Sequence, residues 1–218
     1  GIQVANWNAT LDDEAQSKDL LARMTVEALE AQTDLENYIN AHQGILDRTT
    51  RLAMRLQDTQ RCEQVDEETK NLVLSVGDFP PPRFSLSIAR QALNTDRLAL
   101  IANSKVQDSV STISDEMNFI SLQWRRYVEL KRETELAVGT AAGVALTAPR
   151  ENILLSSQDF NPDRYILLTP AKICGDAKII AVVSNVEITQ QVYVGYLTQL
   201  QEALAKHVEV LTKSASAS

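Results

Sequence analysis

Twelve positions at alternating steps of three and four run from Leu21 to Thr59, and nine of them are apolar; this heptad spacing predicts one long α-helix with a continuous seam. No proline interrupts residues 11–65, and Thr10 precedes acidic residues as at a typical helix start, so we expect a helix over residues 10–65. Such a helix is about 80 Å long, whereas a compact domain of this length is about 45 Å across. We therefore expect an elongated molecule or a bend, for which Gly44 is the weakest point.

Three consecutive prolines, Pro80 to Pro82, end this pattern, and we expect a break over residues 77–84. A second helix is expected over residues 85–138. Its later half repeats the seam spacing, whereas its earlier half is offset, which indicates a stutter or a change of packing partner. Two such helices fold back most simply as an antiparallel hairpin.

Residues 139–183 are expected to be irregular, with short strands. The β-branched run 178–183 either forms a hairpin with residues 165–168 or leads into the last helix. Ser184 and Glu187 match a capping box, which predicts a third helix over residues 185–213. The predicted fold is a single mainly α domain, 1–218: an elongated antiparallel helical hairpin or bundle of three long helices, with a small mixed element near residues 160–183.

Composition and charge narrow the classes of function that the chain can have. The 218 residues include 7 glycines and 6 prolines, and aromatic residues make up 5% of the chain, which is typical of helical rather than loop-rich proteins. The net charge is −8, and the first 70 residues carry 14 acidic and 7 basic side chains. Because an acidic helix repels phosphate backbones and anionic lipids, we expect no nucleic-acid partner.

Catalytic, metal and cofactor motifs are missing from the sequence. It contains no nucleophile elbow, no His-Glu-x-x-His helix, no Cys-x-x-Cys pair and no phosphate-binding loop. The only histidines, His42 and His207, occupy seam positions. A pH switch or a metal pair is one interpretation, and polar layers that fix helix register are the favoured one. We therefore expect no enzyme, no metal and no cofactor.

Cys62 and Cys174 are 112 positions apart. A disulfide requires Cα atoms within about 7 Å, which spacing cannot establish, and two buried thiols are the favoured interpretation. No segment reaches the roughly 18 apolar residues of a membrane span. Because the chain begins at Gly1 rather than Met, we expect a processed product; whether a signal or an anchor preceded Gly1 stays open, and an extracytoplasmic location is slightly favoured. Membrane contact is expected only through such an anchor or through the small apolar residues 136–148.

Together these patterns predict a non-enzymatic interaction or scaffold protein that binds itself or a protein partner through helical faces. The alternatives are an extracytoplasmic helical sensor that binds a ligand and a membrane-acting, pore-forming-like helical protein. Since three seams occur in one chain, they are expected to pack mainly against one another. The candidate seam residues are Leu21, Met24, Leu35, Tyr38, His42, Ile45, Leu52, Leu56, Val110, Ile113, Met117, Ile120, Trp124 and Tyr127.

Overall fold

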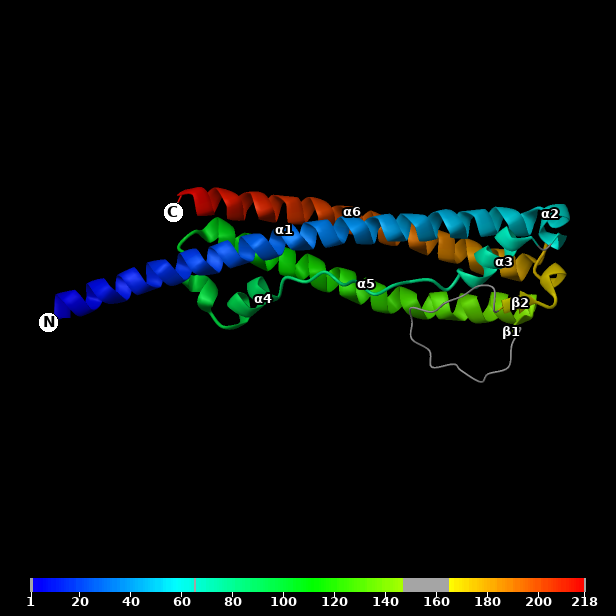
Figure 1. Ribbon diagram of the computed structural model, residues 1–218, viewed down its shortest axis with the longest axis horizontal. Coiled ribbons are helices and arrows are strands. Elements are labelled where there is room, and N and C mark those ends of the chain that lie inside the picture. Colours follow the sequence, from blue (N-terminus) through cyan, green and yellow to red (C-terminus); the bar gives the residue numbers. More distant parts are fainter. Residues whose placement is uncertain (1, 65, 147–164, 218) are drawn as a thin grey trace. The chain divides into compact units, whose positions relative to one another are not determined.

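The computed structural model describes residues 2–64, 66–146 and 165–217, and it is mainly α-helical (Figure 1). Three long helices, α1 (Ile2–Gln57), α5 (Ser104–Ala142) and α6 (Ala177–Ala217), pack together, which confirms the predicted fold class. The shorter helices are α2 (Thr59–Glu63), α3 (Glu67–Leu74) and α4 (Ser87–Asn94), with 3₁₀ turns η1 (Arg97–Leu100) and η3 (Pro170–Lys172). Strands β1 (Val144–Leu146) and β2 (Tyr165–Leu167) form a two-stranded antiparallel sheet.

The chain divides into two compact units, and each contains a segment of all three long helices. Unit 1 comprises Gly1–Asn40, Pro81–Gln123 and Gly195–Ser218, and unit 2 comprises Ala41–Pro80 and Trp124–Val194. In unit 2, the end of α1, the end of α5 and the start of α6 share one apolar cluster, with Leu56, Ala142 and Ile179 among its members. Within this unit α5 therefore runs in the same direction as α1, and α6 is their antiparallel neighbour (Figure 1).

This connection differs from a direct turn between the first two long helices. The predicted break, 77–84, lies inside the non-helical stretch between α3 and α4. Because proline lacks an amide hydrogen and has a fixed φ, Pro80–Pro82 favour an extended chain. Since α5 runs parallel to α1 in unit 2, the chain between them reverses its direction before that segment of α5. The antiparallel neighbour of both helices in unit 2 is α6.

Several predicted helix bounds are wrong. The first helix begins at Ile2, so Thr10 lies inside it. It ends at Gln57 rather than at residue 65, and the next residue, Asp58, caps α2. The helix expected over 85–138 is α4, η1 and α5, because Asp96 adopts a left-handed φ of 56° that interrupts helical hydrogen bonding. The side chain of Asn103 then accepts a hydrogen bond from the amide of Lys105 and starts α5 anew.

The third helix and the strands also need correction. α6 begins at Ala177, eight residues before the predicted start at 185, because the Asp176 carboxylate accepts hydrogen bonds from the amides of Lys178 and Ile179. Ser184 is consequently interior to α6, and the run 178–183 is helical. β2 pairs instead with β1, which follows a left-handed turn at Gly143 (φ 67°).

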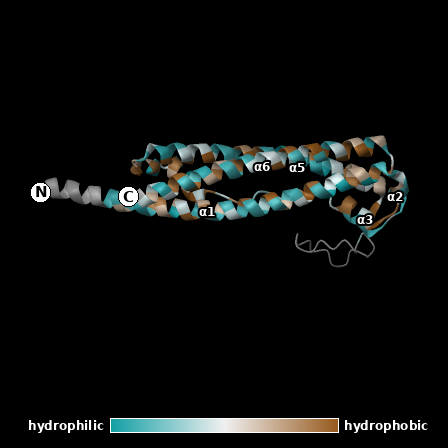
Figure 2. Ribbon diagram, turned by 90° about the horizontal axis from the view of Figure 1, so that it is seen from above, coloured by the Kyte–Doolittle hydropathy of each residue, from teal (hydrophilic) through white to brown (hydrophobic). Residues whose placement is uncertain are grey.

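Apolar and polar residues alternate along the three long helices, as Figure 2 shows by colour. The apolar seam side chains are buried, including Met24, Leu35, Leu52, Ile113 and Leu204. In unit 1, a carboxylate of α1 contacts the start of α4. Glu27 accepts hydrogen bonds from the Ser87 hydroxyl (2.7 Å) and from the amides of Ile88 (2.8 Å) and Ala89 (3.2 Å), so it caps a helix distant in sequence.

Candidate functional site

The predicted seam residues lie inside the units. Twelve of them are buried, and Trp124 and Tyr127 are partly buried; the buried residues are Leu21, Met24, Leu35, Tyr38, His42, Ile45, Leu52, Leu56, Val110, Ile113, Met117 and Ile120. The Trp124 indole donates a hydrogen bond to the carbonyl oxygen of Phe79 (3.3 Å). These side chains are covered within their own chain, so a partner would have to contact other surfaces.

A polar layer crosses unit 2 at His42, whose ring is fully buried. The side-chain amide of Gln190, on α6, donates to His42 Nδ1 (2.8 Å) and to the His42 carbonyl oxygen (3.1 Å). Since a carbonyl oxygen only accepts, the Gln190 nitrogen faces both atoms, and Nδ1 accepts. Phe79 and Tyr193 pack edge-on against the imidazole, with ring centroids 5.1 and 5.0 Å away.

Lys131 lies beside this layer and is 1% exposed. Its ammonium has no hydrogen-bond partner among the described residues and lies 5.8 Å from the centre of the Phe79 ring. Burial lowers the pKa of Lys131 to about 8, Asp78 opposes that shift, and Arg48 adds to it. Arg48 itself pairs with Asp78 (3.2 Å), so one carboxylate serves two cations.

The electrostatics of the layer keep His42 neutral near pH 7. Burial lowers the pKa of His42 to about 4, and the nearby charge of Lys131 contributes to the same shift. A hydrogen bond to the backbone of Pro80 acts in the opposite direction. Burial also raises the pKa of Asp78, against the effects of Arg48 and Lys131.

Unit 1 contains a second polar layer at His207 of α6, which is 1% exposed. Its Nδ1 lies 2.8 Å from the hydroxyl of Ser109 on α5, and its Nε2 has no hydrogen-bond partner among the described residues. Burial lowers the pKa of His207 to about 4, and the charge of Glu27 acts in the opposite direction. In the part of the chain that the structure describes, no group of three or more His, Cys, Asp or Glu side chains is arranged to hold a metal ion.

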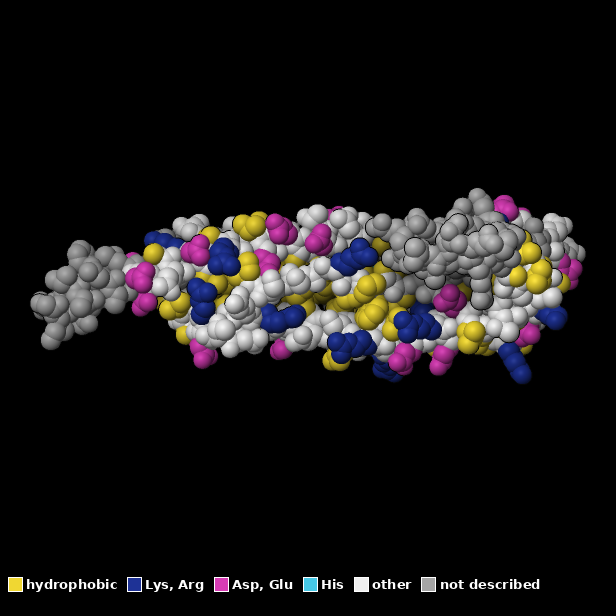
Figure 3. All heavy atoms as spheres, turned by 60° about the horizontal axis from the view of Figure 1, so that its bottom comes forward, with side chains coloured by type: hydrophobic (Ala, Val, Ile, Leu, Met, Phe, Trp, Pro, Cys, Tyr) yellow, Lys and Arg dark blue, Asp and Glu magenta, His cyan; other side chains and the backbone are white. Residues whose placement is uncertain are grey.

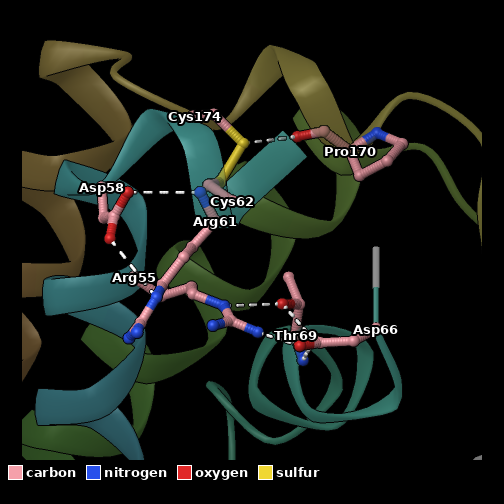
Figure 4. The surroundings of a disulfide bond; sticks show 8 residues. All are labelled: Arg55, Asp58, Arg61, Cys62, Asp66, Thr69, Pro170 and Cys174. Atoms are coloured by element: carbon pink, nitrogen blue, oxygen red, sulfur yellow. Dashed lines mark hydrogen bonds and ion pairs between the residues drawn. A yellow bond between two sulfur atoms is a disulfide. The ribbon is translucent and has the colours of Figure 1, made fainter. Parts of the chain in front are cut away.

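The expectation of two buried thiols is wrong, because Cys62 and Cys174 form a disulfide (Figure 4). Their Cα atoms are 5.6 Å apart, within the range that a disulfide requires. Arg55 reinforces this end of unit 2: its guanidinium donates to Thr69 Oγ1 (2.9 Å) and pairs with Asp66 (Figure 4). Asp66 also caps α3 by accepting from the Thr69 amide (2.7 Å), and these hydrogen bonds, led by that of Arg55, lower the pKa of Asp66.

Outside the buried layers, the surface carries both charges and apolar side chains. On the face drawn in Figure 3, basic, acidic and hydrophobic side chains are interspersed. In unit 1, Phe119 of α5 is 36% exposed and meets Tyr196 of α6 edge-on with ring centroids 5.0 Å apart, while Leu122, one turn further along α5, is 60% exposed. We call Phe119, Leu122 and Tyr196 the aromatic patch.

Unit 2 also has an open groove of about 480 Å³ between α3 and α5. Its apolar lining includes Val73, Leu136 and Val144, and Arg132 and Glu135 add charge. The segment 136–148, considered above for membrane contact, forms the end of α5, the turn at Gly143 and β1 as far as residue 146; residues 147–148 lie outside the described part.

Sequence reasoning missed Lys131 and Gln190, although a signal for both was present. The seam at Trp124 and Tyr127 continues by steps of three and four to positions 131, 134 and 138, but the charge at 131 hides it. Gln190 likewise lies three residues before Tyr193, which is buried in α6. A polar residue at a seam position is a candidate for a buried partner.

Among the helices of the described residues, none has a stretch long and apolar enough to cross a membrane. Comparison with protein-family models, with curated proteins and with solved structures gives no match for this chain.

Proposed function

We propose that this chain is a non-enzymatic interaction or scaffold protein that binds a protein partner through the outer faces of its helical bundle. The observation that carries the proposal is the aromatic patch, because it leaves large apolar side chains in solvent while the seams are buried. Tyrosine and phenylalanine are enriched at protein interfaces, where they bury much area with few rotatable bonds.

We propose that the partner bound by the aromatic patch is a second copy of the chain. The patch combines apolar side chains on α5 with the tyrosine of α6, so each copy offers both an apolar surface and a hydroxyl. A two-fold contact requires this kind of self-complementary surface. Charged side chains around it would select the partner without adding much affinity.

The disulfide supports an extracytoplasmic location for this activity. Cys62 is completely buried, and the bond joins α2 to the segment that precedes α6. Structural disulfides persist in oxidising compartments and are rare in the reducing cytosol. We therefore place the proposed interaction in an oxidising compartment.

Sedimentation equilibrium tests the proposal. A Phe119→Ser/Leu122→Ser variant is expected to weaken self-association at least tenfold. Its melting temperature should fall slightly, because Leu122 is 60% exposed but Phe119 is 36% exposed and contacts Tyr196. Val26→Ser/Leu29→Ser is the matched control, since these α1 side chains are 56% and 48% exposed outside the patch. If the wild-type chain remains monomeric at high concentration, the proposed self-association is refuted.

A photo-crosslinking amino acid at position 122 then tests whether other proteins bind the aromatic patch in cells that make the protein. Adducts at position 122 but not at position 26 support a scaffold role with a different partner. Absence of adducts at both positions, together with a monomer, refutes the interaction function altogether.

The groove between α3 and α5 favours one alternative, a ligand-binding or sensor role. Its size suits a small molecule, and Arg132 and Glu135 supply opposite charges beside an apolar floor. A thermal-shift screen of small amphipathic acids and amines tests it. Stabilisation that disappears in Leu136→Asp would favour the sensor role over the scaffold role.

A further inference from the structure

In each unit, a buried histidine takes part in a side-chain hydrogen bond that joins α6 to a neighbouring helix, in addition to the Thr50–Glu187 bond of unit 2 and the Asn103–Ser214 bond of unit 1. In unit 2 the bond joins Gln190 of α6 to His42 of α1, and in unit 1 it joins His207 of α6 to Ser109 of α5. Both histidines lie in the helix seams and are shielded from water. Their protonation therefore acts directly on the contacts that join α6 to its neighbours.

Protonation of His42 breaks its polar layer for a geometric reason. Nδ1 accepts a hydrogen bond from Gln190, so a proton on Nδ1 would place two donors against each other. Rotating the amide by 180° would offer Nδ1 an acceptor but would turn the amide oxygen toward the His42 carbonyl oxygen, which now accepts from the same amide. Either arrangement loses a buried hydrogen bond, so the cationic ring does not fit this site.

His207 cannot accommodate a proton either. A serine hydroxyl accepts or donates, so Ser109 satisfies Nδ1 in both protonation states. The cationic ring, however, also carries a proton on Nε2, and this buried atom has no acceptor among the described residues. A buried charged donor without a partner is costly.

In unit 2 the charged side chain that acts on His42 is Lys131 of α5, which disfavours the cationic ring and so favours release of α6. Arg48 of α1 and Asp78 act on Lys131 rather than on the ring, and Asp78 also pairs with Arg48. Tyr193 of α6 and Phe79 supply the apolar walls.

In unit 1 the charged side chain that acts on His207 is Glu27 of α1, which favours the cation. Glu27 is already engaged by the hydroxyl and amides at the start of α4. The cationic His207 ring would therefore be attracted by the charge of Glu27, but its Nε2 would have no hydrogen-bond acceptor among the described residues.

The start of α6 is attached by bonds that do not depend on these histidines. Cys174 is linked covalently to Cys62, and the amide of Gly175 donates to the carbonyl oxygen of Leu56 (2.9 Å). Gly175 has a φ of 69°, a conformation that favours glycine, directly before the helix. Loss of the histidine contacts would thus leave α6 tethered at its first residues.

We propose that α6 is an acid-released arm: protonation of His42 and His207 detaches it from α1 and α5, while the Cys62–Cys174 disulfide keeps its first turn in place. This device does not depend on the proposed scaffold function. It exposes the apolar seam of α6 and the faces that α6 covers.

Hydrogen exchange followed by mass spectrometry tests the proposal on the disulfide-intact chain. With histidine pKa values of about 4 in the closed state and 6.5 in the released state, lowering the pH from 7 to 5 should increase α6 opening roughly 20-fold per histidine. Protection factors, corrected for intrinsic exchange, are therefore expected to fall over residues 185–213 and to be retained near Cys174. His42→Gln should abolish the fall around residue 190, and His207→Gln the fall around residue 207.

Three results would overturn the proposal: constant α6 protection down to pH 5, an equal fall in α1, α5 and α6, or the same fall in the doubly substituted chain. If a variant fails to fold, imidazole NMR titration of the wild type decides. Histidines that titrate together with the loss of α6 protection support the device. Histidines that titrate near pH 6.5 while α6 stays protected refute it.

Discussion

Replacing the buried Lys131 with methionine should stabilise the protein near neutral pH. The lysine is 1% exposed and its ammonium has no hydrogen-bond partner among the described residues, so the folded state buries a charge that the unfolded chain leaves in water. Methionine is unbranched and of similar length, so it can follow the same path against Phe79 without the charge. Replacing buried charges with apolar residues of similar volume is often stabilising.

The pKa shift sets the size and the pH window of this effect. The pKa of Lys131 falls from 10.5 to about 8 on folding, chiefly because of burial. Below pH 8 both states are protonated and the full penalty, about 3 kcal/mol, is present. Between pH 8 and 10.5 the unfolded chain binds more protons than the folded protein, so the stability of the wild type rises with pH in that window.

Urea unfolding at pH 7, 9 and 10.5 measures both predictions. We expect Lys131→Met to raise the free energy of unfolding by about 1–3 kcal/mol at pH 7; the upper bound is the net penalty from the pKa shift, which already includes the attraction to Asp78. The wild type should approach the variant as the pH rises. Lys206→Met, at an exposed position of α6, is the control and should change stability by less than about 0.5 kcal/mol.

A destabilised Lys131→Met protein with the wild-type pH dependence would refute this reasoning. It would mean that the ammonium is stabilised in the folded state by more than burial costs it. Asp78→Asn would then identify the source, because its carboxylate is the group that favours the charged lysine.

Three further predictions concern the contacts that define the units. Glu27→Ala should destabilise unit 1 by about 1–2 kcal/mol and accelerate amide exchange at the start of α4, whereas Glu27→Gln retains an acceptor and should lose less. Replacing Cys62 and Cys174 with serine should cost about 4–5 kcal/mol in the chain-entropy estimate, because the bond closes a long loop; a loss below 1 kcal/mol in urea unfolding would contradict it. Gly143→Ala should lower the melting temperature, since its φ is 67° and the added Cβ would lie 2.7 Å from a threonine hydroxyl, whereas Gly44→Ala inside α1 should raise it, the nearest atom being 3.7 Å away.

The heptad spacing predicted the long helices well because burial of a seam is a property of regularly spaced residues on one helix. Each apolar seam residue between Leu21 and Leu56 is buried in the structure. Ends of helices were harder to predict, since they depend on single capping contacts and competing signals. At the start of α6, Asp176 caps the helix before the Ser184 box can act, and the disulfide at Cys174 anchors the preceding turn.

The direction of α5 and the pairing of the cysteines follow from long-range contacts that no local pattern reports. An extended segment such as 77–84 can lead into a helix of either direction, so the proline run located the break without specifying the return path. The disulfide depends on that path, because it brings residues 112 positions apart together. The buried Lys131 was missed for the opposite reason: its charge made a seam position resemble a solvated one.

The two histidine layers are better explained as contacts that fix the register of α6 than as contacts that raise the stability of the fold. A slide of α6 by one heptad would preserve an apolar seam but would bring residue 183 or 197, a valine or a leucine, to the place of Gln190. His42 Nδ1 would then lose its donor, at about 1–3 kcal/mol for a buried unsatisfied group. The same slide would separate His207 from Ser109 in unit 1, so the two penalties act together on one helix. Apolar seams alone permit several registers, and the two polar layers together select one. The same two contacts that select the register at neutral pH are the ones that protonation removes.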